Sequence, residues 1–255
     1  GTALMIGNPP NVMIGSATHL DFNDFLINLA PVVVITVIVI LIAVLLIFKN
    51  DFSGVRMSAK ELEKIDIMSG VEDKSIFSRS LMVLALTVLG FVVHSHFGLE
   101  SATVAMTGRM AALLFCGINP EDALKEVDLD TLMFFMGLFI LVGGMENAGV
   151  ITAIAEKGIE MVDGDSHLIT FLILLLSGVA SAFVDNIPFT ATMIPLIQDM
   201  QSLMNLPHAD YMWWALATGA CFGGNGTMIG ASPNVIMVAI AAKEGFNISF
   251  TAFMK

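Results

Sequence analysis

A short pattern that occurs twice, each time interrupting apolar sequence, most constrains how this chain can fold. The pattern Met-Ile-Gly-x-x-Pro-Asn-Val covers residues 5–12 and again residues 228–235, an offset of 223 positions with six identities in eight. Gly and Pro both disfavour a continuous helix. Paired Gly/Pro-interrupted apolar segments are typical of internal repeats around a transporter's binding site. We therefore interpret the pattern as a structural repeat, with chance similarity between two Gly/Pro-rich breaks as the alternative.

The second copy lies in a glycine-rich stretch between two apolar runs, Met212–Phe222 and Val235–Ala242, each too short to cross a bilayer. Glycines at positions 223, 224, 226 and 230 each cost a helix about 1 kcal/mol relative to Ala. Pro233 suits the first turn of a new helix, with Ser232 as its cap. We predict one membrane helix over residues 210–243, broken near its middle. Unwound backbone at membrane depth is stable only inside protein or along a wet cavity, so the break is a candidate binding site.

The class of protein follows from composition and from one long apolar run. Charged residues make up 13% of the chain and hydrophobic residues 56%, whereas a soluble domain carries about 25% charged residues. Pro31–Phe48 holds eighteen residues without a charge, which is enough to span a bilayer. We predict an all-α polytopic membrane protein with two buried free cysteines and no signal peptide. The net charge of −12 gathers in loops, so we expect no nucleic-acid partner.

The polar segment 49–79 divides the chain. It contains six of the eleven basic residues, which predicts a cytoplasmic loop, and Ser58 and Glu61 form a candidate capping box within it. We interpret residues 1–48 as the end of a first repeat and residues 80–255 as a second repeat. Because the chain opens on Gly1 within a motif, we interpret it as a fragment that lacks the start of the first repeat. The further elements expected are spans over residues 80–97, 101–117 and 131–144, an amphipathic helix within 145–165 and a re-entrant hairpin over 167–204.

Asp185 lies between two hydrophobic stretches with no loop to carry it to water. An uncompensated carboxylate there costs several kcal/mol, so it is paired, protonated or bound to an ion. We place Asp185 and Asn186 at the hairpin tip and predict that Pro188 breaks the helix just after them. The alternative is a kinked continuous helix with a structural acid.

Other polar residues leave two interpretations open. Arg109 falls near the middle of a predicted span, where it has either a structural charge partner or a substrate contact. Glu146 is either an acid in the first turn of the amphipathic helix or a carboxylate of an ion pathway. His94 and His96 lie at a predicted membrane boundary, and we favour an interfacial role over a metal site.

The polar groups of the two breaks and the hairpin tip are together suited to binding a cation. Asn8 is placed to cap a helix starting at Pro9, so both breaks present helix N-termini. Carbonyl groups around residues 223–227 add oxygens for a transient Na⁺, but no resident metal or cofactor is expected. A carboxylate that holds either a proton or a cation is the physical basis of antiport. The side chains expected to hold the ion are Asp185, Asn186, Asn225, Thr227 and Asn234.

Four segments, at residues 1–11, 127–139, 181–190 and 224–234, resemble the ArsB/NhaD branch of the ion transporter superfamily. This branch includes arsenite carriers, Na⁺/H⁺ antiporters and the melanosomal P protein, and its domain is called citrate-transporter-like. The resemblance implies inverted repeats, each with a re-entrant hairpin and a broken helix, and a first hairpin preceding Gly1. It assigns to the site Asp185, Asn186 and Thr190 of the second hairpin, Asn225, Gly226, Thr227, Ser232 and Asn234 of the second break, and Gly7, Asn8, Pro10 and Asn11 of the first.

Related dicarboxylate carriers have a Ser-Asn-Thr motif where this chain has Asp185-Asn186-Ile187, and an acid there favours cation or proton coupling. The leading hypothesis is a secondary transporter, an Na⁺- or H⁺-coupled antiporter in the bacterial cytoplasmic membrane, with a second copy as a candidate homodimer partner. An arsenite, antimonite or organic-anion permease of the same superfamily and a passive channel are alternatives. An intramembrane hydrolase is disfavoured because a His-Glu-x-x-His helix is absent, so no enzymatic activity is expected.

Overall fold

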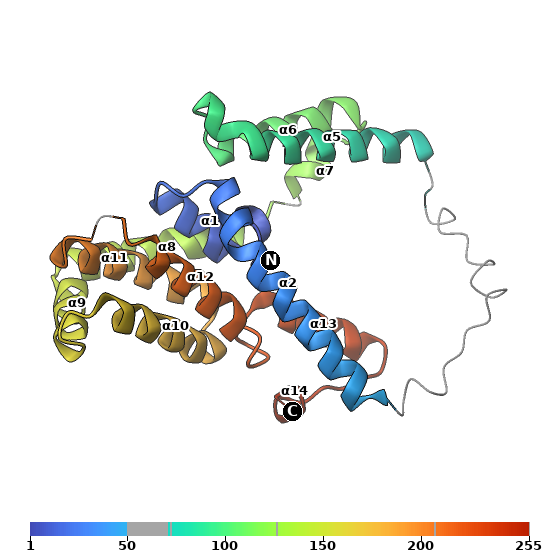
Figure 1. Cartoon of the computed structure of the whole chain (residues 1–255). Coiled ribbons are helices and arrows are strands. Elements are labelled where there is room, and N and C mark those ends of the chain that lie inside the picture. The colour runs from blue at the N-terminus through green and yellow to red at the C-terminus, as the bar shows by residue number, and fades with distance from the viewer. Residues whose placement is uncertain (50–70, 72, 126, 207, 255) are drawn as a thin grey trace. The chain divides into compact units, whose positions relative to one another are not determined.

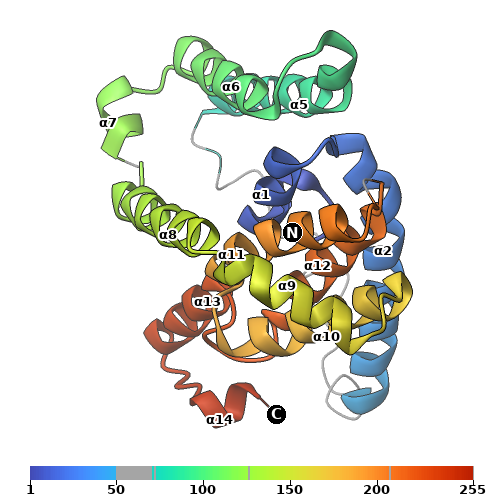
Figure 2. The ribbon, with the colours of Figure 1, turned by 90° about the vertical axis from the view of Figure 1, so that its left-hand side faces the viewer.

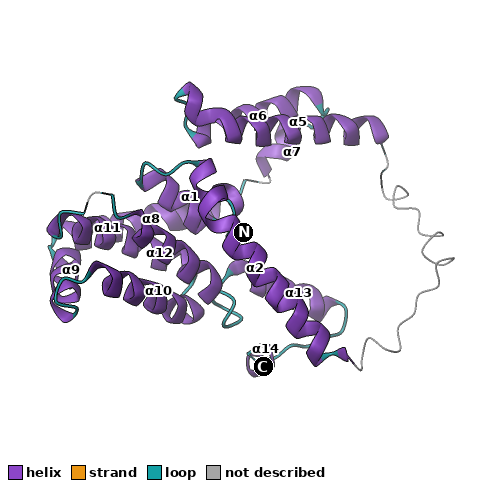
Figure 3. Cartoon of the chain, in the orientation of Figure 1, coloured by secondary structure: helices purple, strands orange, loops and turns teal. Residues whose placement is uncertain are grey.

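The protein is described by a computed structural model that covers residues 1–49, 71, 73–125, 127–206 and 208–254. Within these residues every regular element is a helix, as Figure 3 shows. The predicted capping box at Ser58 and Glu61 lies outside the described residues. The chain divides into two compact units, residues 1–32 with 130–255 and residues 33–129.

The larger unit contains both copies of the repeated pattern (Figure 1). A short helix, η1, and helix α1 carry the first copy, and helix α2 begins in this unit and continues into the other. The bounds are η1 Met5–Gly7, α1 Pro9–Ala17, α2 Phe22–Ile47, α8 Leu129–Asn147, α9 Val150–Met161, α10 Ser166–Phe183, α11 Asn186–Leu203, α12 Asp210–Gly223, α13 Ser232–Lys243 and α14 Phe250–Phe253.

In the smaller unit, α5 (Lys74–Val93) and α6 (Ser101–Phe115) form an antiparallel pair, joined through η2 (His94–Phe97) and followed by α7 (Pro120–Lys125). Gly98 turns the chain with a left-handed φ of 62°. Helix α5 begins six residues before the predicted span at Ser80. The reason is a cap: the Asp73 carboxylate accepts hydrogen bonds from the backbone amides of Ser75 and Ile76.

Four described helices are long and apolar enough to cross a membrane: α2, α5 with η2, α8 and α10. α2 has 26 residues, which exceeds the roughly 20 needed for a bilayer. The all-helical polytopic membrane fold predicted from composition is therefore confirmed. α6 and α13 are apolar but shorter.

The closest helix contact in the larger unit joins α10 and α12, which lie side by side in Figures 1 and 2. A Cβ added at Gly223 would lie 2.3 Å from the Gly178 carbonyl oxygen, and one at Gly219 would lie 2.6 Å from that of Leu174. Ser181 Oγ donates across the interface to the Ala220 carbonyl oxygen at 2.7 Å. Small residues thus allow the two backbones to touch, as in other membrane helix pairs.

Candidate functional site

The second break separates α12 from α13 by residues 224–231, and one asparagine braces it. Asn234 Nδ2 donates to the carbonyl oxygens of Gly224 at 2.8 Å and Thr227 at 3.0 Å. Asn234 is buried, so these bonds satisfy groups that water does not reach. The Asn234 side chain therefore holds the unwound backbone in one conformation.

The predicted cap at Ser232 is wrong. Ala231 is the N-cap of α13, with extended backbone at φ −155°, and Ser232 is the first helical residue, exposed to solvent. The backbone amide of Asn234 instead bonds the Ala231 carbonyl oxygen at 3.0 Å. Helix α13 therefore begins at Ser232, one residue earlier than it would if Ser232 were the cap. Pro233 is favourable at the second position of this helix, which allows the earlier start.

The first break repeats this construction. Asn11, the counterpart of Asn234, is fully buried and donates from Nδ2 to the carbonyl oxygens of Thr2 at 2.9 Å and Leu4 at 3.0 Å. Asn8 is the N-cap of α1, and its Oδ1 accepts the Asn11 amide, as the sequence predicts. Its backbone is extended at φ −156°, matching Ala231 at the corresponding position.

The glycines of the two breaks also correspond. A Cβ added at Gly1 would lie 3.0 Å from the Gly7 carbonyl oxygen, and one added at Gly224 would lie 3.0 Å from that of Gly230. The amide of Gly7 bonds the Leu4 carbonyl oxygen, and that of Gly230 bonds the Thr227 carbonyl oxygen. Contacts reproduced at the same offset of 223 residues favour a structural repeat over chance similarity.

The two breaks are joined through Cys221 in the last turn of α12. Asn8 Nδ2 lies 2.7 Å from Cys221 Sγ, which in turn lies 3.6 Å from Asn11 Oδ1. Cys221 and Cys116 are both buried free thiols, as predicted. Cys221 thus acts as a packed contact between the second broken helix and the first.

The hairpin tip lies between α10 and α11, where only Val184 and Asp185 are outside the helices. Asp185 Oδ1 accepts the Ile187 amide at 2.9 Å, so the carboxylate caps α11. Pro188 does not break the helix, contrary to the prediction. It lies in the first turn of α11, where backbone amides have no intrahelical partner and the missing N–H is tolerated.

The tip packs against the second break. Thr227 Oγ1 donates a hydrogen bond to the Ala182 carbonyl oxygen at the end of α10. A Cβ added at Gly230 would lie 2.8 Å from the Ser181 carbonyl oxygen, and one at Gly224 would lie 3.3 Å from Asn186 Nδ2. Only glycine therefore allows this approach of the break to the tip.

Two buried hydroxyl groups, one on α10 and one on α11, have no partner among the described residues. Thr190 lies four positions after Asn186, on the same face of α11, and is fully buried with an unpaired Oγ1. Ser177, on α10, is also fully buried and unpaired. An unsatisfied buried hydroxyl costs about 1–3 kcal/mol, so each is available to a water molecule or a ligand.

The remaining candidate residues of the breaks lie at the surface, except Pro10. Asn225 is exposed, and its Nδ2 donates to the Cys221 carbonyl oxygen at 3.3 Å, which leaves Oδ1 for a ligand. Gly226 and Gly7 are exposed, whereas Pro10 is buried in the first turn of α1. The structure thus brings the candidate residues of both breaks and the tip into one unit.

Sequence reasoning missed Ser177 and Ser181, which lie on the face of α10 that packs against α12. Their spacing of four residues, with Gly178 between them, puts them on one helix face. That small-residue face was the available signal. It was hidden within the longer apolar run that the sequence analysis placed in the re-entrant hairpin.

Arg109 lies in the other unit, on α6, and its Nη2 donates to the Ala123 carbonyl oxygen of α7 at 3.1 Å. Its partner there is a backbone group, and no described carboxylate forms an ion pair with it. His94 is buried, with Nδ1 2.8 Å from the Phe91 carbonyl oxygen. No group of three described His, Cys, Asp or Glu residues is arranged to hold a metal ion.

Glu146 occupies the last turn of α8, and α9 begins only at Val150. The interpretation as an acid in a first helical turn is therefore wrong. Gly149, with φ 71°, ends one helix before the next begins, because glycine adopts this left-handed conformation without strain.

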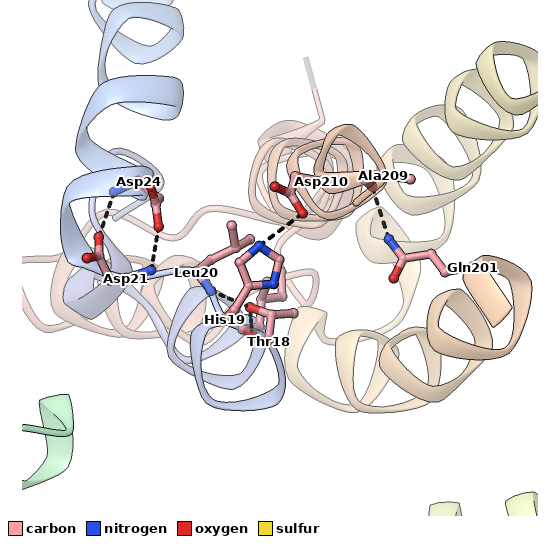
Figure 4. A network of polar contacts seen from close by, with 9 residues as sticks. Thr18, His19, Leu20, Asp21, Asp24, Gln201, Ala209 and Asp210 are labelled. Carbon is pink, nitrogen blue, oxygen red and sulfur yellow. Dashed lines mark hydrogen bonds and ion pairs between the residues drawn. The ribbon is translucent and has the colours of Figure 1, made fainter. Parts of the chain in front are cut away.

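A polar network at the far end of α12 ties that helix to the turn between α1 and α2 (Figure 4). His19 Nε2 lies 3.4 Å from Asp210 Oδ1, and Gln201 Nε2 donates to the Ala209 carbonyl oxygen at 3.0 Å. α12 has 14 residues, so this network lies about 20 Å from the break. Both ends of α12 therefore contact the segment around the first copy. Cys221 contacts Asn8 and Asn11 at one end, and Asp210 contacts His19 at the other.

Comparisons with known proteins identify relatives of the whole chain. Residues 1–219 match the family described as citrate transporter, CitMHS. An uncharacterised transporter of Mycobacterium tuberculosis is 38% identical over 261 residues, which covers 100% of this chain and 59% of the relative. The 46 kDa membrane protein of Mycobacterium leprae is 34% identical, covering 100% of this chain and 60% of that protein.

The mouse P protein is 38% identical over 196 residues, which covers 71% of this chain and 23% of the P protein. The resemblance noted from the sequence motifs is thus confirmed. The chain spans about three fifths of the length of the mycobacterial relatives it matches.

Proposed function

Since this chain belongs to the CitMHS citrate transporter family, we propose that it forms the ion-coupling part of a secondary transporter, an antiporter driven by Na⁺ or H⁺. The protein is an integral membrane protein by its family and its apolar helices. A transport function is supported by the family and by relatives that are named transporters. The coupling ion and the direction of coupling are our proposal.

The observation that carries the proposal is the meeting of an acidic helix cap with a braced helix break. Asp185 caps α11, and the carbonyl oxygen of Ala182, three residues earlier, is bonded by Thr227 of the break. Asn186 and Thr190 follow in the first turns of α11, both buried and Thr190 with an unpaired hydroxyl. Oxygen atoms of this kind suit Na⁺, and a carboxylate beside them suits a proton.

The arrangement of rigid and unwound segments supports a proposed alternating-access movement. α10 and α12 are locked together by direct backbone approach at Gly219 and Gly223. Each break, at residues 1–8 and 224–231, is braced by a buried asparagine side chain, Asn11 or Asn234. We propose that occupancy of the tip by a cation or a proton biases the movement of one helical bundle against the other.

We further propose that residues 49–79 face the cytoplasm of a bacterial cell, in keeping with their basic residues and the positive-inside rule. The partners in this account are the lipid bilayer, a small inorganic ion and a small anion, with a second copy of the chain as a candidate partner.

A transport assay with Asp185→Asn tests the proposal. Asn retains the cap because its side-chain oxygen also accepts the Ile187 amide, but it removes the charge. We expect the full-length protein in proteoliposomes to lose Na⁺- or H⁺-coupled flux while inserting normally. Asp163→Asn is the matched control, since Asp163 is exposed with φ 50°, a conformation that Asn also adopts. Coupled, pH-dependent flux by Asp185→Asn at the wild-type rate would refute the role of Asp185.

An organic anion is the second candidate substrate, because the family carries the description citrate transporter. Helices α1 and α13 begin at Pro9 and Ser232, next to the two breaks. Their N-termini carry partial positive charge and would attract carboxylate groups. Arsenite is a third candidate from the sequence resemblance alone. Parallel flux measurements with Na⁺, citrate and arsenite distinguish the three, and counter-ion dependence separates antiport from a passive channel.

A further inference from the structure

The Cys221 thiol contacts two side-chain amides of the first copy from the last turn of α12, where it is buried. Its sulfur lies 2.7 Å from Asn8 Nδ2 and 3.6 Å from Asn11 Oδ1. A thiol has one S–H to donate and a weakly accepting sulfur atom. The sulfur therefore accepts from Asn8, and the S–H donates to Asn11.

These two contacts fix the direction in which each asparagine amide is turned. A carboxamide has a donor end and an acceptor end, so exchanging the two ends loses its bonds. With Nδ2 of Asn8 on the sulfur, its Oδ1 is left to accept the Asn11 backbone amide as the cap of α1. With Oδ1 of Asn11 on the S–H, its Nδ2 is left to donate to the carbonyl oxygens of Thr2 and Leu4. One thiol thus orients both the cap of α1 and the brace of the first break.

The second break differs at the matching position. Ala231 stands where the first break has Asn8, and α13 has no side-chain cap. The first break therefore takes part of its order from α12, and α12 is also the helix that leads into the second break at Gly224. A displacement of the last turn of α12 would change the second break and release both amides of the first.

We propose that Cys221 is a positioning residue that couples the two breaks. It acts through Asn8 and Asn11 and not as a ligand of the ion. Its thiol keeps the first break ordered only while the last turn of α12 is in place, so the two breaks change conformation together. The part of this coupling in transport rests on the function proposed above, but the contacts of the thiol do not.

The Na⁺ concentration that gives half-maximal flux in proteoliposomes tests the coupling in the full-length protein. Cys221→Ala removes both contacts, and we expect this concentration to rise roughly tenfold, the effect of about one lost hydrogen bond. Cys221→Ser keeps a donor and an acceptor and should restore a value close to that of the wild type. Cys116→Ala is the matched control, because Cys116 is also a buried free thiol but lies in the other unit. An unchanged half-maximal concentration in Cys221→Ala, or a Cys221→Ser protein that behaves like it, would overturn the coupling.

A spectroscopic measurement tests the contacts without transport. In a full-length protein that keeps Cys221 as its single cysteine, the infrared S–H stretching band reports this thiol alone. Hydrogen bonding lowers the frequency of this band, so we expect Asn11→Leu to raise it and Asn147→Leu, at an exposed helix end, to leave it in place. A band that Asn11→Leu does not move would overturn the proposal. A shifted band together with Na⁺-independent flux in the wild type would support the contact and refute only the antiport function proposed above.

Discussion

At the scale of single residues, the structure explains how Asp185 is accommodated between apolar helices. Its carboxylate caps α11 through the Ile187 amide, so part of its desolvation cost is offset by a charge-assisted hydrogen bond. The position of this acid follows from the sequence, because no loop separates the flanking apolar runs. Its hydrogen-bond partner does not, because a cap depends on where the helix begins to within one residue.

The unpaired Thr190 hydroxyl gives a prediction that separates function from stability. Thr190→Val keeps the β-branched shape and removes a buried group whose lack of a partner costs about 1–3 kcal/mol. We expect the thermal midpoint in detergent to stay constant or rise, while Na⁺-dependent flux falls.

Thr192→Val provides the control, since Thr192 Oγ1 already bonds the Phe189 carbonyl oxygen of its own helix at 2.8 Å. Its flux should match the wild type. If Thr190→Val transports normally and only changes the melting temperature, Thr190 is structural and does not belong to the site.

At the scale of helices, periodicity and apolar length were sufficient to locate most elements. The predicted span over residues 131–144 lies within α8, and the predicted break within 210–243 falls between Gly223 and Ser232. The early start of α5 was missed because it depends on the Asp73 cap. Glu146 was assigned to the wrong helix because Gly149 divides an otherwise continuous helical pattern.

The α10–α12 contact could not be predicted from sequence, because it joins residues about forty positions apart through backbone atoms. It predicts that Gly223→Ala is severe, since the added Cβ would lie 2.3 Å from the Gly178 carbonyl oxygen. The helices would have to separate, at a cost of about 1–3 kcal/mol typical of overpacking. We expect a lower thermal midpoint together with loss of flux.

Gly137→Ala is the matched comparison within α8, where a Cβ meets nothing within 4 Å. Alanine is favoured over glycine in a helix interior by about 1 kcal/mol, so this variant should melt at or above the wild-type temperature. Equal melting temperatures for Gly223→Ala and the wild type would show that the backbones are not in contact.

At the scale of the whole molecule, two copies of one pattern, 223 residues apart, form the two helix breaks. Six identities in eight positions indicate this repeat, and Asn11 and Asn234 both bond the carbonyl groups at corresponding positions, those of Leu4 and Thr227. Sequence could place both breaks but not the Cys221 contact that joins them. That contact depends on how α1 packs against α12, which no local pattern encodes.

The repeat predicts that the two bracing asparagines are equivalent in function. Asn11→Asp and Asn234→Asp each replace a donor of two hydrogen bonds with an acceptor facing the same two carbonyl groups. Both loops should lose their fixed conformation. Asn147→Asp is the control, because the Asn147 bond to the Gly143 carbonyl oxygen lies on an exposed helix end.

A site shared by the two breaks is tested by the Na⁺ dependence of flux in proteoliposomes, measured side by side for Asn11→Asp and Asn234→Asp in the full-length protein. If the two breaks and the Asp185 tip form one ion-coupled site, both variants lose Na⁺-dependent flux and Asn147→Asp retains it. Normal Na⁺ dependence in either Asn11→Asp or Asn234→Asp, with the protein correctly inserted, would contradict a site shared by the two breaks.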